Sequence, residues 1–214
     1  MTDAQKRRRM KKIVSALEEI YPDASCALEY GGEPWRLMVM ARLSAQCTDA
    51  RVNEVCRVLF EKFPTLDELA DAPLEEIARI IRPCGLSNTK SKNISLCAIE
   101  IRDKYDGEVP PDMDKLTTLP GIGRKSANVV LGDAFNIPGF PVDTHVRRVL
   151  NRIGLVNCDQ PEKIESIVNS LVPPEKWSNF SHLIIRHGRD ICNAAKPRCA
   201  QCPLAELCKY KGKK

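Results

Sequence analysis

Four cysteines near the end of the chain are spaced closely enough to bind a metal together: Cys192, Cys199, Cys202 and Cys208. Thiolates bind soft metals, and four of them this close together suit either a structural zinc ion or an iron–sulfur cluster. Zinc ribbons more often contain two Cys-x2-Cys pairs, whereas this segment has one. All four thiolates would be used as ligands, which leaves no open position, so the site is predicted to be structural rather than catalytic. The residues alone leave zinc and iron–sulfur open.

A second candidate site is the segment Leu119-Pro-Gly-Ile-Gly-Arg-Lys125, which precedes an apolar-faced helix. Gly121 and Gly123 permit positive φ angles and a close approach of a ligand to the backbone. The free N–H groups at the start of the next helix can then hold a phosphate. A tight turn between two helices without a ligand also suits the two glycines. The complete segment, with Lys125 directly behind it, favours the phosphate site.

Helical periodicity runs through almost every segment longer than ten residues, and Pro and Gly clusters separate the segments. Period-2 alternation bounded by turns is absent, so the sequence predicts an all-α fold. A domain boundary is expected near residues 136–142, where Asn-Ile-Pro-Gly-Phe-Pro interrupts two helices. The predicted helices are Lys6–Tyr21, Trp35–Leu43, Thr48–Phe63, Thr65–Ala72, Leu74–Ile81, Asn88–Tyr105, Arg124–Ala134, Thr144–Ile153, Glu162–Leu171 and Trp177–His187.

The composition is that of an ordinary globular protein: 214 residues, 43% hydrophobic, with a formal net charge of +5. These values exclude disorder, collagen and coiled coil, and no apolar run or signal peptide is evident, so a cytoplasmic protein without a membrane segment is expected. Residues 186–214 hold eight basic and two acidic side chains. Such a charge excess is typical either of chain ends exposed to solvent or of a surface that binds a polyanion. Six further cysteines are scattered, and most of them are predicted to be small buried hydrophobic residues: Cys26, Cys47, Cys56, Cys84, Cys97 and Cys158.

Five segments in order resemble those of the helix-hairpin-helix DNA glycosylases that carry an iron–sulfur cluster. They are residues 43–49, 85–90, 119–125 and 142–146 and the four-cysteine segment, and the resemblance runs from residue 35 to 211. It implies a base-excision repair enzyme that removes oxidised pyrimidines from duplex DNA and cleaves the abasic site by β-elimination. It also implies a monomer that works on double-stranded DNA with a damaged base, in association with the nucleoid.

The same resemblance implies two helical domains with a DNA-binding groove between them. Residues 23–135 would form a six-helix domain with the helix-hairpin-helix. Residues 1–22 and 136–214 would form the iron–sulfur cluster domain.

Individual roles also follow from the resemblance. Lys125 would be the nucleophile and Asp143 the second catalytic carboxylate, while Gln46 and Leu86 would fill the gap left when the damaged nucleotide is extruded. Judged as isolated residues, Asp143 is a helix N-cap, Leu86 packs in the core and Gln46 is a buried amide. The cap and the catalytic role of Asp143 are compatible.

The four cysteines would hold a [4Fe-4S] cluster. Lys196 and Arg198, between the first two ligands, are counter-ions to the cluster or contacts to DNA phosphates.

Two other functions fit the residues. One is a monofunctional thymine- or adenine-mismatch glycosylase of the same fold, although the adenine enzyme lacks the lysine that Lys125 would supply. The other is a non-enzymatic DNA-binding module with an iron–sulfur cluster.

Overall fold

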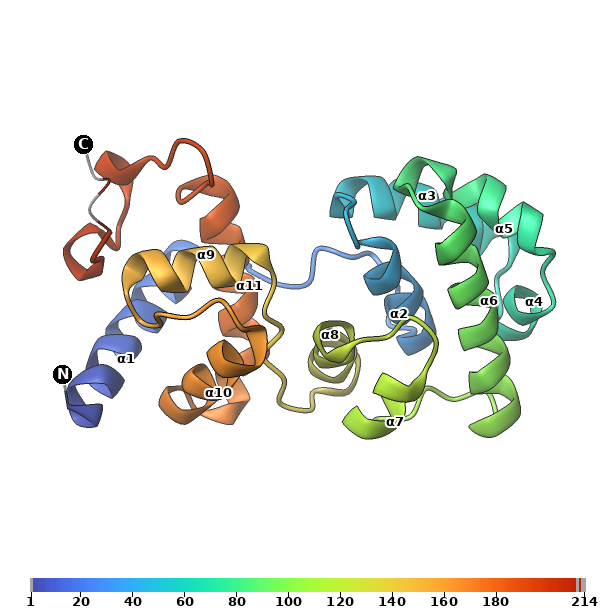
Figure 1. Cartoon of the computed structure of the whole chain (residues 1–214), viewed down its shortest axis with the longest axis horizontal. Coiled ribbons are helices and arrows are strands. Elements are labelled where there is room, and N and C mark those ends of the chain that lie inside the picture. The colour runs from blue at the N-terminus through green and yellow to red at the C-terminus, as the bar shows by residue number, and fades with distance from the viewer. Residues whose placement is uncertain (1, 211, 213–214) are drawn as a thin grey trace. The chain divides into compact units, whose positions relative to one another are not determined.

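The computed structural model describes residues 2–210 and 212, and the regular structure within them is entirely helical (Figure 1). The prediction of an all-α fold is confirmed. None of the described helices is long and apolar enough to cross a membrane. The helices are α1 Asp3–Ile20, α2 Pro34–Leu43, α3 Asp49–Lys62, α4 Leu66–Ala70, α5 Leu74–Ile81, α6 Ser87–Lys104, α7 Met113–Thr118, α8 Arg124–Phe135, α9 Thr144–Ile153, α10 Pro161–Leu171 and α11 Trp177–Asp190, with short 3-10 turns at Arg82–Cys84, Pro174–Lys176, Cys199–Gln201 and Ala205–Leu207.

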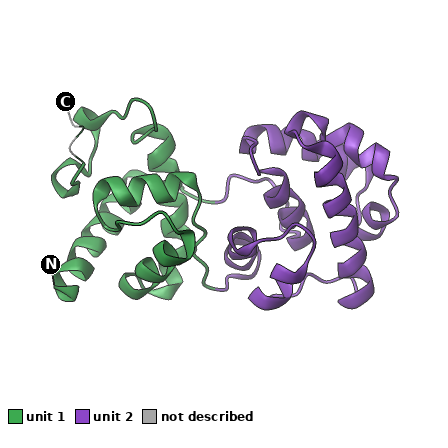
Figure 2. Ribbon diagram, in the orientation of Figure 1, with its two compact units in different colours: residues 1–25, 138–214 green, residues 26–137 purple. Residues whose placement is uncertain are grey.

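The chain forms two compact units (Figure 2). One comprises residues 26–137, and the other joins residues 1–25 to residues 138–214. Each unit has its own hydrophobic core.

In the unit 26–137, α2 is the central element. Leu37, Met38, Val39 and Met40 are all buried on it, so most of the circumference of this helix is buried, as expected of a helix inside a core. α2 packs against α8, α6 and α3, and α6 in turn packs against α4 and α5. The two segments that leave this core, after α2 and before α6, carry Gln46 and Leu86.

Side-chain caps fix where several of these helices begin. Thr65 and Glu68 form a reciprocal capping box at the start of α4, as the sequence predicts. Thr48 caps α3 and Asp112 caps α7 by accepting one backbone N–H of the first turn with the side-chain oxygen.

In the other unit, α11 packs against α9 and α1, and the core contains Phe140 and Phe180 in a stacked pair. The basic N-terminal segment contributes to this unit directly. The guanidinium of Arg9 donates to the carbonyl oxygens of Gly154 at 3.0 Å and Leu207 at 2.6 Å. Arg9 therefore joins α1 to the cysteine segment rather than standing free in solvent.

The prediction that most of the six scattered cysteines are buried holds for half of them. Cys56, Cys84 and Cys97 are buried, whereas Cys26, Cys47 and Cys158 are partly exposed. Burial raises the pKa of Cys97 to about 12. Cys47 and Cys158 lie in irregular segments rather than inside a helix, which explains why the apolar neighbours in sequence do not enclose them.

Candidate functional site

The hairpin between α7 and α8 is built on one glycine with a left-handed backbone. Gly121 has φ +78, and a Cβ there would lie 2.6 Å from Nε of Arg42 and 2.9 Å from Nδ2 of Asn93. Ile122, between the two glycines, is buried and anchors the hairpin to the core. Glycine is therefore required at residue 121 for both its conformation and its lack of a side chain.

Gly123 has a different role from the one predicted. Its φ is −100 and its ψ is 173, an extended conformation, and a Cβ there would meet nothing within 4 Å. The expectation of two glycines at positive φ is wrong for Gly123, because this residue is the N-cap of α8 and N-caps adopt extended backbone angles. No side chain caps α8 through Gly123, which leaves the helix start open to an anion.

Lys125 lies in the first turn of α8, as predicted, and its side chain is exposed. Lys125 thus stands directly behind the hairpin, at a helix terminus suited to phosphate.

Gln46 and Leu86 are both exposed, and both adopt positive φ angles, +58 and +51. The side chain of Leu86 is 62% exposed. The isolated-residue expectations of core packing for Leu86 and of a buried amide for Gln46 are therefore wrong. Non-glycine residues in this conformation are uncommon and concentrate at functional segments.

Lys90 is a residue whose role the sequence did not reveal. It is 1% exposed, and its ammonium donates to the carbonyl oxygens of Leu43 at 2.9 Å, Ala45 at 2.8 Å and Cys84 at 2.8 Å. A signal was available: residues 90, 94, 98 and 101 form the buried face of α6, and only the first is charged. A lysine on an apolar stripe predicts a buried ammonium that needs partners.

Asp143 belongs to the other unit, so the structure places the two predicted catalytic residues in different units. Oδ1 of Asp143 accepts the backbone N–H of Val146 at 2.7 Å, which confirms the predicted N-cap of α9. The carboxylate is half-buried.

One turn into α9, Arg148 connects this helix to the cysteine segment. Its guanidinium donates to the carbonyl oxygens of Gly188 at 2.9 Å and Cys192 at 3.1 Å. The helix that Asp143 caps is thereby fixed to the first of the four cysteines.

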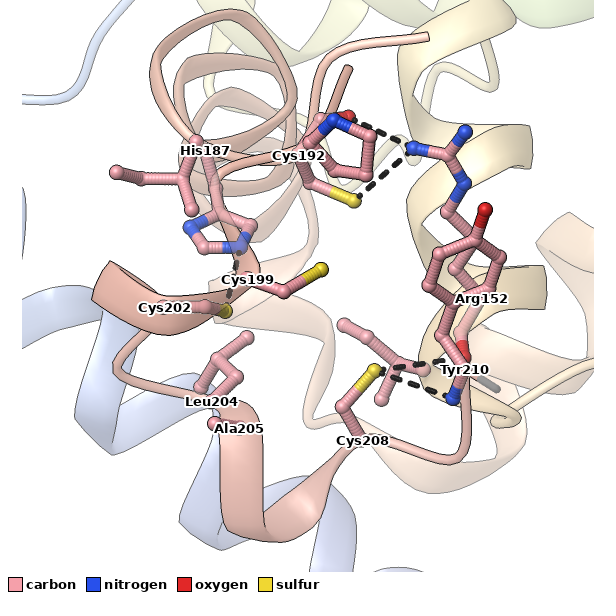
Figure 3. Close-up of a pocket in the computed structure, with 12 residues that line it drawn as sticks. Arg152, His187, Cys192, Cys199, Cys202, Leu204, Ala205, Cys208 and Tyr210 are labelled. Atoms are coloured by element: carbon pink, nitrogen blue, oxygen red, sulfur yellow. Dashed lines mark hydrogen bonds between the residues drawn. The ribbon is translucent and has the colours of Figure 1, made fainter. Parts of the chain in front are cut away.

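Figure 3 shows the four cysteines arranged around one pocket, which Arg152, His187 and Tyr210 also line. Two of the four sulfurs accept hydrogen bonds from nitrogen atoms. Nη1 of Arg152 donates to Sγ of Cys192 at 3.6 Å, and the backbone N–H of Tyr210 donates to Sγ of Cys208 at 3.4 Å. Such donors stabilise negative charge on thiolate ligands.

His187 lies on the opposite side of the pocket, with Nε2 3.6 Å from Sγ of Cys202. Its ring also contacts the hydroxyl of Tyr21, 3.4 Å from Nδ1. Burial lowers the pKa of His187 to about 4, so its imidazole is neutral near pH 7.

A zinc ion and an iron–sulfur cluster require different arrangements of their four sulfur ligands. Across residues 2–210 and 212, no three Cys, His, Asp or Glu side chains are grouped closely enough to hold one metal ion. A single zinc ion requires every sulfur at about 2.3 Å from one point. A polynuclear iron–sulfur cluster binds each cysteine through a different iron, so its four ligands are spread more widely. The four cysteines line one pocket and supply the four thiolates that either kind of site requires.

Lys196 and Arg198 have different surroundings. Lys196 is exposed, whereas the guanidinium of Arg198 donates to the backbone carbonyl of Asp190. The backbone N–H of Arg198 also donates to the carbonyl of Ile191 at 2.9 Å. Arg198 therefore closes the cysteine segment onto the end of α11.

Comparisons with known proteins agree with these features. Residues 39–174 match the HhH-GPD superfamily of base excision DNA repair proteins. Endonuclease III of Synechocystis is 46% identical over 206 residues, which is 96% of this chain and 94% of that protein.

Solved structures extend the comparison to the fold. Endonuclease III in a non-covalent complex with DNA and in a trapped covalent intermediate each superpose with a TM-score of 0.91 at 41% identity, covering 98% of this chain and 96% of theirs. A thermostable thymine-DNA glycosylase gives a TM-score of 0.87 at 25% identity, with 99% of each chain covered. The chain belongs to the HhH-GPD superfamily of base excision DNA repair proteins and, within it, to the endonuclease III family.

Proposed function

We propose that this enzyme removes oxidised pyrimidines from duplex DNA and cuts the strand at the abasic sugar, with Lys125 as nucleophile and Asp143 as its catalytic carboxylate. The observation that carries the proposal is the exposed amine of Lys125 in the first turn of α8, directly behind the Gly121 hairpin. The uncapped start of α8 supports binding of a DNA phosphate beside that amine.

The chemistry proceeds in two stages. The lone pair of the uncharged Lys125 amine bonds to C1′ as the glycosidic bond breaks, and the bond's electron pair leaves with the base, which takes up a proton. Loss of the amine proton opens the sugar ring and gives a Schiff base. Removal of a proton from C2′ then expels the 3′ phosphate, and water releases the lysine. A negative charge on Asp143 favours the positive charge that develops on the sugar in the first stage.

Gln46 and Leu86 support this chemistry by occupying the helix stack after the damaged nucleotide has left it. A glycosylase cannot reach C1′ inside stacked DNA, and the gap left by extrusion needs to be filled. The exposure and left-handed backbone of both residues support this assignment.

A [4Fe-4S] cluster would be held by Cys192, Cys199, Cys202 and Cys208. It would cross-link the C-terminal segment and would take no part in the reaction. The four thiolates that line one pocket, and the family to which the chain belongs, support this choice. Lys196 remains the better candidate for a DNA phosphate contact, because Arg198 already donates to Asp190.

Borohydride trapping tests the proposal. The protein is incubated with duplexes that carry thymine glycol, an abasic site or a G·T mismatch, and then reduced. We expect a covalent adduct with the first two duplexes that disappears in Lys125→Ala, while Lys92→Ala, an exposed lysine on α6, retains it.

Other outcomes identify the alternatives. Release of thymine from the G·T duplex without any adduct would support the monofunctional mismatch enzyme, which the thymine-DNA glycosylase structure makes the second candidate. Binding without base release or adduct would indicate a non-enzymatic module.

A further inference from the structure

Lys90 joins two segments that are far apart in sequence. Its ammonium contacts Leu43 and Ala45, at the end of α2, and Cys84, in the turn before α6. An ammonium has three N–H donors, and the structure gives it three carbonyl acceptors at 2.8 to 2.9 Å. The donors and acceptors are therefore matched one to one in a site that is 1% exposed.

Both segments carry an exposed residue with a left-handed backbone immediately beside these contacts. Ala45, whose carbonyl Lys90 binds, precedes Gln46, and Cys84 lies two residues before Leu86. The carbonyl of Leu86 accepts the backbone N–H of Lys90 at 2.9 Å, the first i→i−4 bond of α6, which does not depend on the lysine side chain. Strained residues of this kind persist only where their surroundings hold them.

We propose that Lys90 is a positioning residue that holds Gln46 and Leu86 together in the conformation that enters the DNA stack. This inference rests on the proposed role of these two residues. Lys90 contacts no reacting atom and acts on extrusion of the nucleotide, through the backbone of both segments.

An apolar or shorter side chain cannot replace this ammonium. Methionine has a similar length but no donor, so it leaves three carbonyl oxygens without the ammonium. Glutamine supplies two N–H donors from one nitrogen and is expected to retain part of the arrangement. Lys92 lies two residues along the same helix, is exposed, and provides the matched control.

Two readouts separate positioning from general loss of structure. Fluorescence of 2-aminopurine, placed beside a thymine glycol in a duplex, measures the unstacking of the DNA. Borohydride trapping on an abasic site in single-stranded DNA measures the chemical step, because this substrate needs no extrusion from a stack. We expect Lys90→Met to reduce the unstacking rate at least tenfold and to change single-strand trapping by less than threefold. The unstacking rate of Lys90→Gln should lie between those of Lys90→Met and the native protein. Lys92→Met should unstack and trap at the native rates.

A double-mutant cycle tests whether Lys90 acts through Leu86. In the Leu86→Ala background, Lys90→Met is expected to slow unstacking by less than threefold further, because the residue that it positions is gone. Equal losses of unstacking and single-strand trapping, full additivity of the two substitutions, or unfolding of both Lys90→Met and Lys90→Gln would each overturn the proposal. If Leu86→Ala alone leaves unstacking unchanged, the proposed role of Leu86 has failed, and this result is distinct from a failure at Lys90.

Discussion

The carboxylate of Asp143 accepts the N–H of Val146 at 2.7 Å, so the residue proposed for catalysis also begins the helix that Arg148 joins to the cysteine segment. Asparagine and aspartate are about equally good N-caps, whereas alanine at this position costs about 1 kcal/mol. Substitutions can therefore separate the cap from the charge.

We expect Asp143→Asn to unfold at the same urea concentration as the native protein while base release slows by about 100-fold or more, as for loss of a single electrostatic stabiliser. Asp143→Ala should show the same kinetic loss and in addition a free energy of unfolding lower by about 1 kcal/mol. Urea titration and single-turnover release of thymine glycol provide the two measurements. Full base release by Asp143→Asn would reduce Asp143 to a helix cap.

The two hairpin glycines form a matched pair for a second prediction. Gly121→Ala places a Cβ 2.6 Å from Nε of Arg42 at φ +78, so strain and collision together should lower the free energy of unfolding by about 2 kcal/mol or more. Gly123→Ala meets nothing within 4 Å at an ordinary φ and should cost less than about 1 kcal/mol, the effect of a poorer N-cap. Urea unfolding of both variants measures the difference, and equal losses would contradict the distinction between the two glycines.

Affinity for duplex DNA should fall more in Gly121→Ala than in Gly123→Ala, since Gly121 sets the shape of the hairpin and Gly123 does not. A salt titration of binding reports the phosphate contacts that remain. If Gly121→Ala binds DNA with native affinity and native salt dependence, the hairpin does not hold a phosphate.

A third prediction concerns the metal. The purified protein should contain iron and absorb broadly in the visible range, and Cys199→Ser should lose both, together with stability, because cluster binding is coupled to folding of the segment. Cys158→Ser is the control, since Cys158 lies outside the pocket that the four cysteines line. A colourless protein with one equivalent of zinc would contradict the choice of iron, because zinc is a d10 ion without visible absorption.

The helices were predictable because their signals are local. The Thr65–Glu68 capping box and the Asp143 cap of α9 each depend on residues three apart in sequence, and the start of α10 depends on Pro161 alone. Such contacts form in the same way wherever the helix packs. The all-α fold follows from these signals together with the apolar periodicity of each segment.

The site was less predictable because its geometry depends on contacts between distant segments. Gly121 and Gly123 are equivalent in sequence, and the side chains of Arg42 and Asn93 make Gly121 the constrained one. The exposure of Leu86 accompanies a left-handed backbone two residues after Cys84, whose carbonyl accepts from the buried ammonium of Lys90. No pattern of neighbouring residues encodes either contact.

The buried thiol of Cys97 gives a last prediction, on the pH dependence of stability. Sγ of Cys97 lies 3.8 Å from Sδ of Met38, and burial raises its pKa to about 12 from an ordinary value of 9.0. As pH rises above 9, this thiol ionises in the unfolded chain but not in the native one, so the unfolded state binds fewer protons. The free energy of unfolding must then fall with rising pH. One pKa unit corresponds to about 1.4 kcal/mol, so Cys97 should remove about 2 kcal/mol of stability by pH 10.5 relative to pH 8.

The comparison that isolates this effect is the native protein against Cys97→Ala across that pH range. The alanine variant starts less stable at pH 8, because it lacks the packing of the sulfur, and the gap should narrow by about 2 kcal/mol by pH 10.5 since the variant has no thiol to ionise. Differences from other groups cancel, because both proteins carry them. A gap that stays constant between pH 8 and 10.5 in urea titrations would mean that the native thiol ionises as readily as the unfolded one, and that Cys97 is not enclosed against α2.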